Sequence, residues 1–95
     1  MKITEEKIAE IANTAMSSAG YGKDDFAGYY TIYENEEDSY DIAINKVKND
    51  IKEYFTIYIL PITEQGWFIS TNTLDKHELN NKLVELTNLI EQKYA

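Results

Sequence analysis

The chain has no cysteine, no arginine, one proline and one histidine among its 95 residues. The absence of cysteine excludes disulfides, thiol catalysis and cysteine-based zinc or iron sites. No stretch approaches the roughly 18 consecutive apolar residues of a membrane span. The first residues, MKITEEKIAEIA, carry a charge every few positions, which predicts that they are not a signal peptide. We therefore expect a cytoplasmic protein of a bacterial host cell that does not interact with a membrane.

Positive charge is scarce, because nine lysines face seventeen acidic residues and leave a net charge of −8. Proteins that bind nucleic acid directly, or anionic membrane surfaces, need a basic footprint, so both classes are excluded. The apolar fraction of 43% and the aromatic fraction of 13% are typical of a folded chain. We expect residues 1–95 to form a single domain with one modest core. Abundant Ile, Lys, Asn and Tyr, all encoded by AT-rich codons, suggest a low-GC bacterium or its phage as the source.

Two segments have the pattern of amphipathic helices. Residues 4–19 begin with Thr4 as a suitable N-cap, and they carry an apolar stripe at helical spacing up to Gly20. Residues 75–94 begin with Asp75 and Glu78 in the spacing of a capping box. The buried face of this second helix is expected to carry Leu79, Leu83, Leu86 and Ile90. The stripe of the first helix is expected to contain Ile8, Ile11, Ala12, Ala15, Met16 and Ala19.

Four segments between these helices are rich in β-branched and aromatic residues: 28–34, 40–47, 54–60 and 67–71. Short connections between consecutive strands favour an antiparallel meander. The order α-β-β-β-β-α predicts an α+β two-layer sandwich, a four-stranded antiparallel sheet with two helices on one face. From this arrangement we expect Ile11, Met16, Ile42, Ile57, Ile59, Leu83 and Leu86 to be buried.

Period-two alternation divides the strand residues between the two faces of the sheet. The residues expected to face the helices are Tyr30, Ile32, Tyr40, Ile42, Ile44, Phe55, Ile57, Ile59 and either Trp67 with Ile69 or Phe68. The residues expected on the opposite face are Tyr29, Thr31, Tyr33, Asp41, Ala43, Asn45, Tyr54, Thr56 and Tyr58. The second set is unusually aromatic for a surface. A β-bulge or a one-residue slip would reassign its members.

The densest charge in the chain lies between the first two predicted strands, in the block Glu34, Glu36, Glu37, Asp38 and Asp41. One interpretation is a solvated hairpin turn whose charges discourage edge-to-edge aggregation. The other is a protein-binding surface, because alternate carboxylates on an extended chain lie about 6.6 Å apart and resemble successive phosphates. The block lacks the spacing and the glycine of a calcium-binding loop.

Tyrosines flank this acidic block and recur on the next strand. An exposed tyrosine on an open sheet needs no special role, because tyrosine is a good strand former. Tyrosine is also favoured at interfaces, since it offers a large contact area at a low cost in conformational entropy. The candidate partner-binding tyrosines are Tyr29, Tyr33, Tyr40, Tyr54 and Tyr58.

No pattern of residues indicates catalysis. His77 is the single histidine, and no serine is recognisably paired with it as a nucleophile with its base. One histidine does not build a histidine-based metal centre, and no phosphate-binding loop is present. We expect no enzyme activity, no metal and no cofactor.

The composition and the two surface features favour a non-catalytic inhibitor of a basic protein, such as a nuclease or another nucleic-acid-binding protein. In general profile the chain resembles phage anti-defence proteins, including anti-CRISPR proteins and DNA mimics, and also acidic nuclease-immunity proteins. No motif ties it to either group. Two alternatives remain: a structural or regulatory subunit that forms a homodimer through the tyrosine face, and a small-molecule-binding α+β domain.

Overall fold

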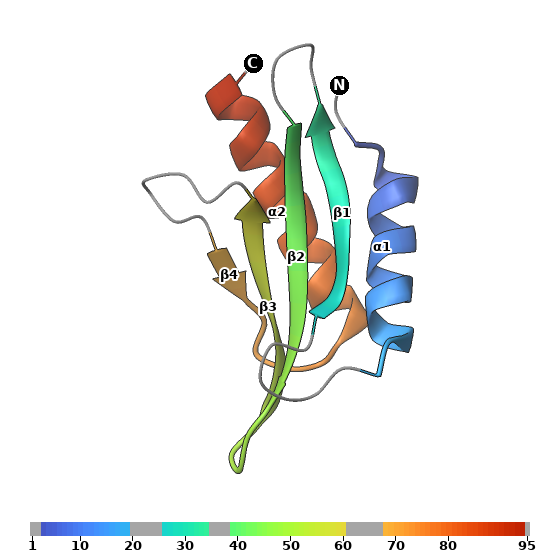
Figure 1. Cartoon of the computed structure of the whole chain (residues 1–95), viewed down its shortest axis with the longest axis vertical. Helices are drawn as coiled ribbons and strands as arrows, with labels where there is room; N and C mark the ends of the chain where they lie inside the picture. The colour runs from blue at the N-terminus through green and yellow to red at the C-terminus, as the bar shows by residue number, and fades with distance from the viewer. Residues whose placement is uncertain (1–2, 20–25, 35–38, 61–67, 95) are drawn as a thin grey trace.

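Two helices and four strands follow one another in the order α1-β1-β2-β3-β4-α2, which confirms the predicted α+β class (Figure 1). The structure is a computed structural model that describes residues 3–19, 26–34, 39–60 and 68–94. Within these ranges, the side chains of residues 26, 33, 34, 93 and 94 are not described. The elements are α1 (Glu5–Ser17), β1 (Phe26–Glu34), β2 (Ser39–Lys48), β3 (Glu53–Leu60), β4 (Phe68–Ser70) and α2 (Lys76–Tyr94).

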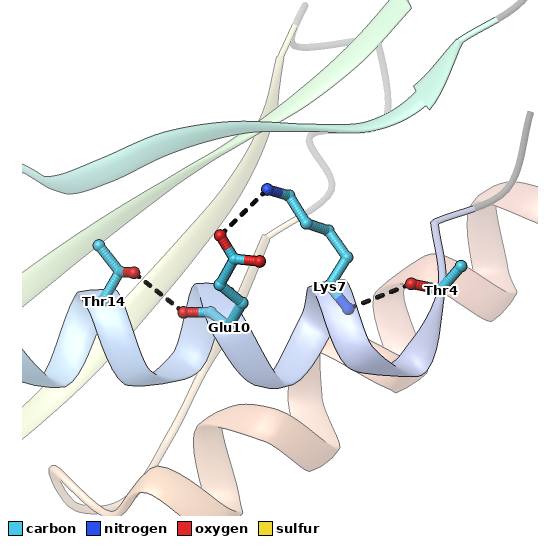
Figure 2. Close-up of polar contacts among 4 residues, drawn as sticks. All are labelled: Thr4, Lys7, Glu10 and Thr14. Atoms are coloured by element: carbon cyan, nitrogen blue, oxygen red, sulfur yellow. Dashed lines mark hydrogen bonds and ion pairs between the residues drawn. The ribbon is translucent and has the colours of Figure 1, made fainter.

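Helix α1 begins where the sequence predicts. The Thr4 hydroxyl accepts a hydrogen bond of 3.1 Å from the backbone N–H of Lys7, as an N-cap does (Figure 2). On the exposed side, the Lys7 ammonium pairs with the Glu10 carboxylate at 3.4 Å, and the Thr14 hydroxyl donates to the Glu10 carbonyl. These contacts are local, so the sequence around Thr4 is enough to place the start of the helix, whereas most of its stability comes from packing of its apolar stripe.

The other end of α1 differs from the prediction. The helix ends at Ser17, Met16 is 36% exposed and Ala19 is exposed, so the expected burial of these two residues is wrong. The buried stripe consists of Ile8, Ile11, Ala12 and Ala15 alone. Met16 lies about 90° around the helix axis from the middle of that stripe. Ala19 follows the last helical turn, where helical spacing no longer applies.

The four strands form one antiparallel sheet in the order β1-β2-β3-β4, which is the predicted meander. β2 and β3 pair without interruption from Asp41 with Leu60 to Lys48 with Glu53. β1 is less regular, because its register with β2 shifts between Phe26 and Gly28 and again between Thr31 and Tyr33. Such bulges add twist and make an edge strand a poorer template for a further strand.

One face of the sheet packs against both helices and forms the core. Ile42, Ile44, Phe55, Ile57 and Ile59 lie at 0–1% exposure on this face, as predicted from alternation. Ile69 packs against the same core, which resolves the choice left open for β4. The helices contribute Ile8, Ile11, Ala12, Ala15, Leu79, Leu83, Leu86 and Ile90.

The ring of Tyr30 covers a glycine on this core side of the edge strand. A Cβ atom at Gly28 would lie 2.6 Å from Cε2 of Tyr30, so a larger residue there would displace the ring. The Tyr30 hydroxyl donates to the Ala27 carbonyl at 3.4 Å, and burial raises the pKa of this hydroxyl. The glycine therefore lets an aromatic side chain lie flat along the edge strand.

Helix α2 is capped by side chains from its own first turn. The Asp75 carboxylate accepts from the backbone N–H of His77 at 2.7 Å. The carboxylate of Glu78 turns back and accepts from the backbone N–H of Asn72 and from the hydroxyl of Thr73. Asp75 is thus the N-cap as predicted, but the predicted capping box is not formed, because Glu78 accepts from Asn72 and Thr73 and not from the backbone N–H of Asp75.

The hairpin between β2 and β3 extends beyond the ends of both helices (Figure 1). Its turn is held by Asn49, whose backbone N–H donates to the Lys52 carbonyl and whose side-chain oxygen accepts from the N–H groups of Ile51 and Lys52. At this turn the side chain of Ile51 is 91% exposed.

Candidate protein-interaction face

The side of the sheet opposite the helices is not covered by any described element (Figure 1). We call it the open face. Its residues alternate along the strands with the core residues and pair with one another across the strands. They are Tyr29, Thr31, Asp41, Ala43, Asn45, Val47, Tyr54, Thr56, Tyr58, Leu60, Phe68 and Ser70.

A row of aromatic side chains crosses the open face. The register pairs Tyr29 with Ala43, Ala43 with Tyr58, and Tyr58 with Phe68. The rings of Tyr58 and Phe68 stack with centroids 6.1 Å apart and planes 29° from parallel. Tyr29 is 57% exposed and Phe68 is 63% exposed. Ala43 is buried, so larger side chains close over its methyl group at the centre of the row. We call these four residues the aromatic row.

A carboxylate lies next to the aromatic row on the same face. Asp41 precedes Ala43 by two residues on β2, and its Oδ1 accepts a hydrogen bond of 2.7 Å from the Thr31 hydroxyl across the sheet. Among the described residues, no lysine forms an ion pair with Asp41. The carboxylate is therefore oriented by a neutral donor and not neutralised by a described cation.

A second acceptor lies on the other side of Ala43. The Oδ1 atom of Asn45 is buried and accepts no hydrogen bond from any part of the chain that the structure describes. An unpaired buried acceptor is costly, because it has lost its hydrogen bonds to water without replacement.

Among the described residues, a lysine already contacts an aromatic ring of the open face. Near the β2–β3 turn, the ammonium of Lys52 lies 4.7 Å from the ring centroid of Tyr54, a cation–π arrangement. The neighbouring residues Lys48 and Glu53 form an exposed ion pair at 3.8 Å. The ammonium groups of Lys48 and Lys52 at this end of the sheet thus make contacts within the chain itself.

The acidic block lies mostly outside the described residues. Glu36, Glu37 and Asp38 belong to that undescribed segment, and the side chain of Glu34 is likewise not described. The chain leaves β1 at Glu34 and enters β2 at Ser39, and these two residues lie opposite each other in the register. Asp41 is the one member of the block whose side chain the structure places. A partner-binding role for the block stays a prediction.

The structure separates the predicted tyrosines. Tyr29 and Tyr58 belong to the aromatic row, and Tyr54 lies on the same face closer to the turn. Tyr40 is only 6% exposed and belongs to the core, as alternation predicts, so its ring does not contribute to the open face. The side chain of Tyr33 is not described. The register shift after Thr31 pairs Tyr33 with Tyr40, so alternation from Tyr29 no longer assigns Tyr33 to the open face.

Sequence reasoning passed over one buried charge, that of Lys46. Its side chain lies on the core side of β2 and is 4% exposed, and its ammonium donates to the carbonyls of Met16 and Ser18 at the end of α1. Burial lowers the pKa of this ammonium, because the charged form is less well solvated there. The sequence did contain a signal for this burial. Alternate residues of this strand, Tyr40, Ile42 and Ile44, face the helices, and continuing the alternation places residue 46 on the same face.

No arrangement for metal binding is found among the described residues, where no three His, Asp or Glu side chains cluster suitably. The side chain of His77 is exposed in the first turn of α2. Within the described part of the chain, neither helix is long and apolar enough to cross a membrane.

Comparisons with protein-family models, with curated proteins and with solved structures found no match to this chain.

Proposed function

We propose that this chain is a non-catalytic binding module for a basic protein, and that the open face is its contact surface. The observation that carries this proposal is the aromatic row, in which Tyr29 and Phe68 are more than half exposed and Tyr29 lies on the strand next to Asp41. Exposed aromatic side chains in a contiguous group are typical of protein-binding surfaces.

The charge of the chain supports a basic partner. A net charge of −8 attracts proteins of opposite sign and speeds their association. The absence of arginine leaves lysine as the only strongly basic side chain, and Lys7, Lys48 and Lys82 are paired with neighbouring carboxylates. A partner with a basic surface would therefore meet little repulsion.

A more specific proposal is that the partner normally holds nucleic acid and is inhibited by this chain. It is supported by the sequence of the acidic block, in which carboxylates alternate at positions 34, 36 and 38, because alternate side chains of an extended chain lie about 6.6 Å apart, a spacing similar to that of successive phosphates. The block joins the ends of β1 and β2, and Asp41, its last member, lies on the open face. A surface of this kind combines long-range attraction from the block with close packing from the aromatic row.

The test uses immobilised protein as bait in a lysate of a low-GC bacterium, at low and at high salt. Captured basic proteins are purified, and their binding kinetics are measured with wild type and two variants. Reversing Glu36, Glu37 and Asp38 to lysine should slow association at least about tenfold at low salt, with the difference closing as salt screens the charges. Replacing Tyr29 and Phe68 with serine should instead raise the dissociation rate.

Two outcomes contradict the proposal. If both variants bind a captured basic protein as wild type does, neither the acidic block nor the open face is its contact surface. If analytical ultracentrifugation shows a dimer that the Tyr29 and Phe68 replacements dissociate, the open face is occupied by a second copy of the chain.

A further inference from the structure

We propose that the aromatic row, together with Asp41, binds an arginine side chain of the partner, an inference that rests on the proposed function and names the residue recognised. Three features of the open face carry it: the spacing of two rings and one carboxylate, the orientation of that carboxylate, and a cation–π contact among the described residues of this face.

The spacing suits a single guanidinium group. Tyr29 and Tyr58 flank Ala43 on the two neighbouring strands, and Asp41 is the next open-face residue on β2. Adjacent strands lie about 4.8 Å apart, and alternate residues of one strand about 6.6 Å apart. A planar cation resting on the outer surface of either ring, over the side chains that cover Ala43, is therefore within reach of the Asp41 carboxylate.

The carboxylate is prepared for a charged donor. The Thr31 hydroxyl occupies one acceptor position of Oδ1, and an ionised carboxylate has about four such positions. The hydrogen bond from Thr31 orients the group without neutralising it. A guanidinium can then donate two parallel hydrogen bonds, which are stronger than bonds between neutral groups.

Arginine fits this arrangement better than lysine. Its guanidinium is planar and weakly hydrated, it stacks on aromatic rings, and it matches a carboxylate with two donors. A lysine ammonium is a compact, strongly hydrated charge that does neither as well. The chain contains no arginine of its own, so no internal guanidinium competes for the site.

One tyrosine of the open face, Tyr54, already makes a cation–π contact. The Lys52 ammonium lies 4.7 Å from the centroid of the Tyr54 ring. This contact is on the same face as the aromatic row but closer to the β2–β3 turn.

The experiment is a titration of the ¹⁵N-labelled protein with hexaarginine and, separately, hexalysine, followed by NMR. The two peptides have the same charge, so attraction to the acidic block is common to both. Hexaarginine should shift the signals of Tyr29, Asp41 and Tyr58, and should bind about fivefold more tightly than hexalysine. Asp41→Asn and Tyr58→Leu should each reduce this preference to about one.

The matched control is Asp50→Asn, which removes the same charge from the exposed β2–β3 turn. This variant should keep the full preference for hexaarginine. A thermal unfolding curve for each variant confirms that it is folded before its affinity is compared.

The outcomes separate the two proposals. If both peptides shift open-face signals equally, the face binds basic chains but the arginine inference is overturned. If neither peptide shifts them, the proposed contact surface fails as well. A preference for hexaarginine that survives Asp41→Asn overturns the role of the carboxylate.

Discussion

The two faces of the sheet are built from the same strands and the same alternation, yet they differ in chemistry. On the face under the helices, the buried side chains of β2 and β3 are mostly isoleucines, together with Phe55, Tyr40 and Lys46, and each is at most 6% exposed. On the open face, the same two strands carry Asp41, Asn45, Tyr54 and Tyr58. The backbone hydrogen bonds lie within the sheet and are common to both faces. The difference in side chains therefore follows from what packs on each face.

Under the proposed function, stability and recognition are divided between the faces. The covered face removes apolar surface from water, which is the dominant favourable term in folding. The open face contributes less to that term, so its residues are freer to serve another purpose. A mutation on one face should therefore change stability, and its neighbour on the other face should change binding.

The largest expected effect lies in the core. Replacing Ile57 or Leu83 with alanine should lower the free energy of unfolding by about 2–5 kcal/mol, through lost burial and the cavity left behind. Ile57 pairs with Ile44 and Ile69 at the centre of the sheet. Urea denaturation measures the effect. Losses below about half a kcal/mol at both positions would mean that the faces are inverted.

The next effect concerns Lys46. Lys46→Met keeps most of the buried stem but leaves the carbonyls of Met16 and Ser18 without the ammonium, which should cost about 1–3 kcal/mol. Urea denaturation at neutral pH gives this value. An unchanged free energy of unfolding would mean that these two carbonyls are equally well solvated without Lys46.

The same variant makes a prediction about pH. Burial lowers the pKa of Lys46 in the folded state below its ordinary value of 10.5. Between the lowered pKa and 10.5 the unfolded chain binds more protons, so the contribution of Lys46 to stability rises with pH. The difference in unfolding free energy between wild type and Lys46→Met should therefore grow as pH rises through this window. A difference that shrinks would reverse the sign of the pKa shift.

On the open face, stability should change little. Phe68→Ser should cost at most about 1 kcal/mol, because the ring is largely exposed and loses mainly its stacking on Tyr58. The double variant with Tyr29→Ser should remain folded, as measured by circular dichroism. A loss comparable to that of Ile57→Ala would show that the open face belongs to the core.

The smallest change in unfolding free energy is expected at Asn45. Here a substitution should leave stability unchanged or increase it, whereas the preceding substitutions should lower it. Asn45→Val removes the unpaired buried acceptor and inserts a good strand former, so the free energy of unfolding should stay unchanged or rise by up to about 1 kcal/mol. The measurement is again urea denaturation. A clear loss of stability would mean that the amide makes a contact that the apolar side chain lacks.

Much of the fold could be predicted because its signals are local. Thr4 and Asp75 cap their helices through neighbouring backbone groups, and alternation on β2 and β3 assigns Ile42, Ile57 and Ile59 to one face. The same reasoning failed for Met16, since the width of a buried helical stripe depends on what packs against it. For Tyr33, a register shift within β1 interrupts the alternation on which the prediction relied.

The sequence by itself determined the order of the elements, the division of β2 and β3 between two faces, and the acidic balance that favours a basic partner. These properties depend on residue spacing and on charge counts, which need no knowledge of distant contacts. Tertiary structure alone decided that Tyr29, Ala43, Tyr58 and Phe68 lie next to one another in one row across the sheet. It also decided that the buried ammonium of Lys46 donates to a carbonyl at the end of α1. Both depend on strand register and helix docking, which bring together residues far apart in the chain and are set by packing of the whole core.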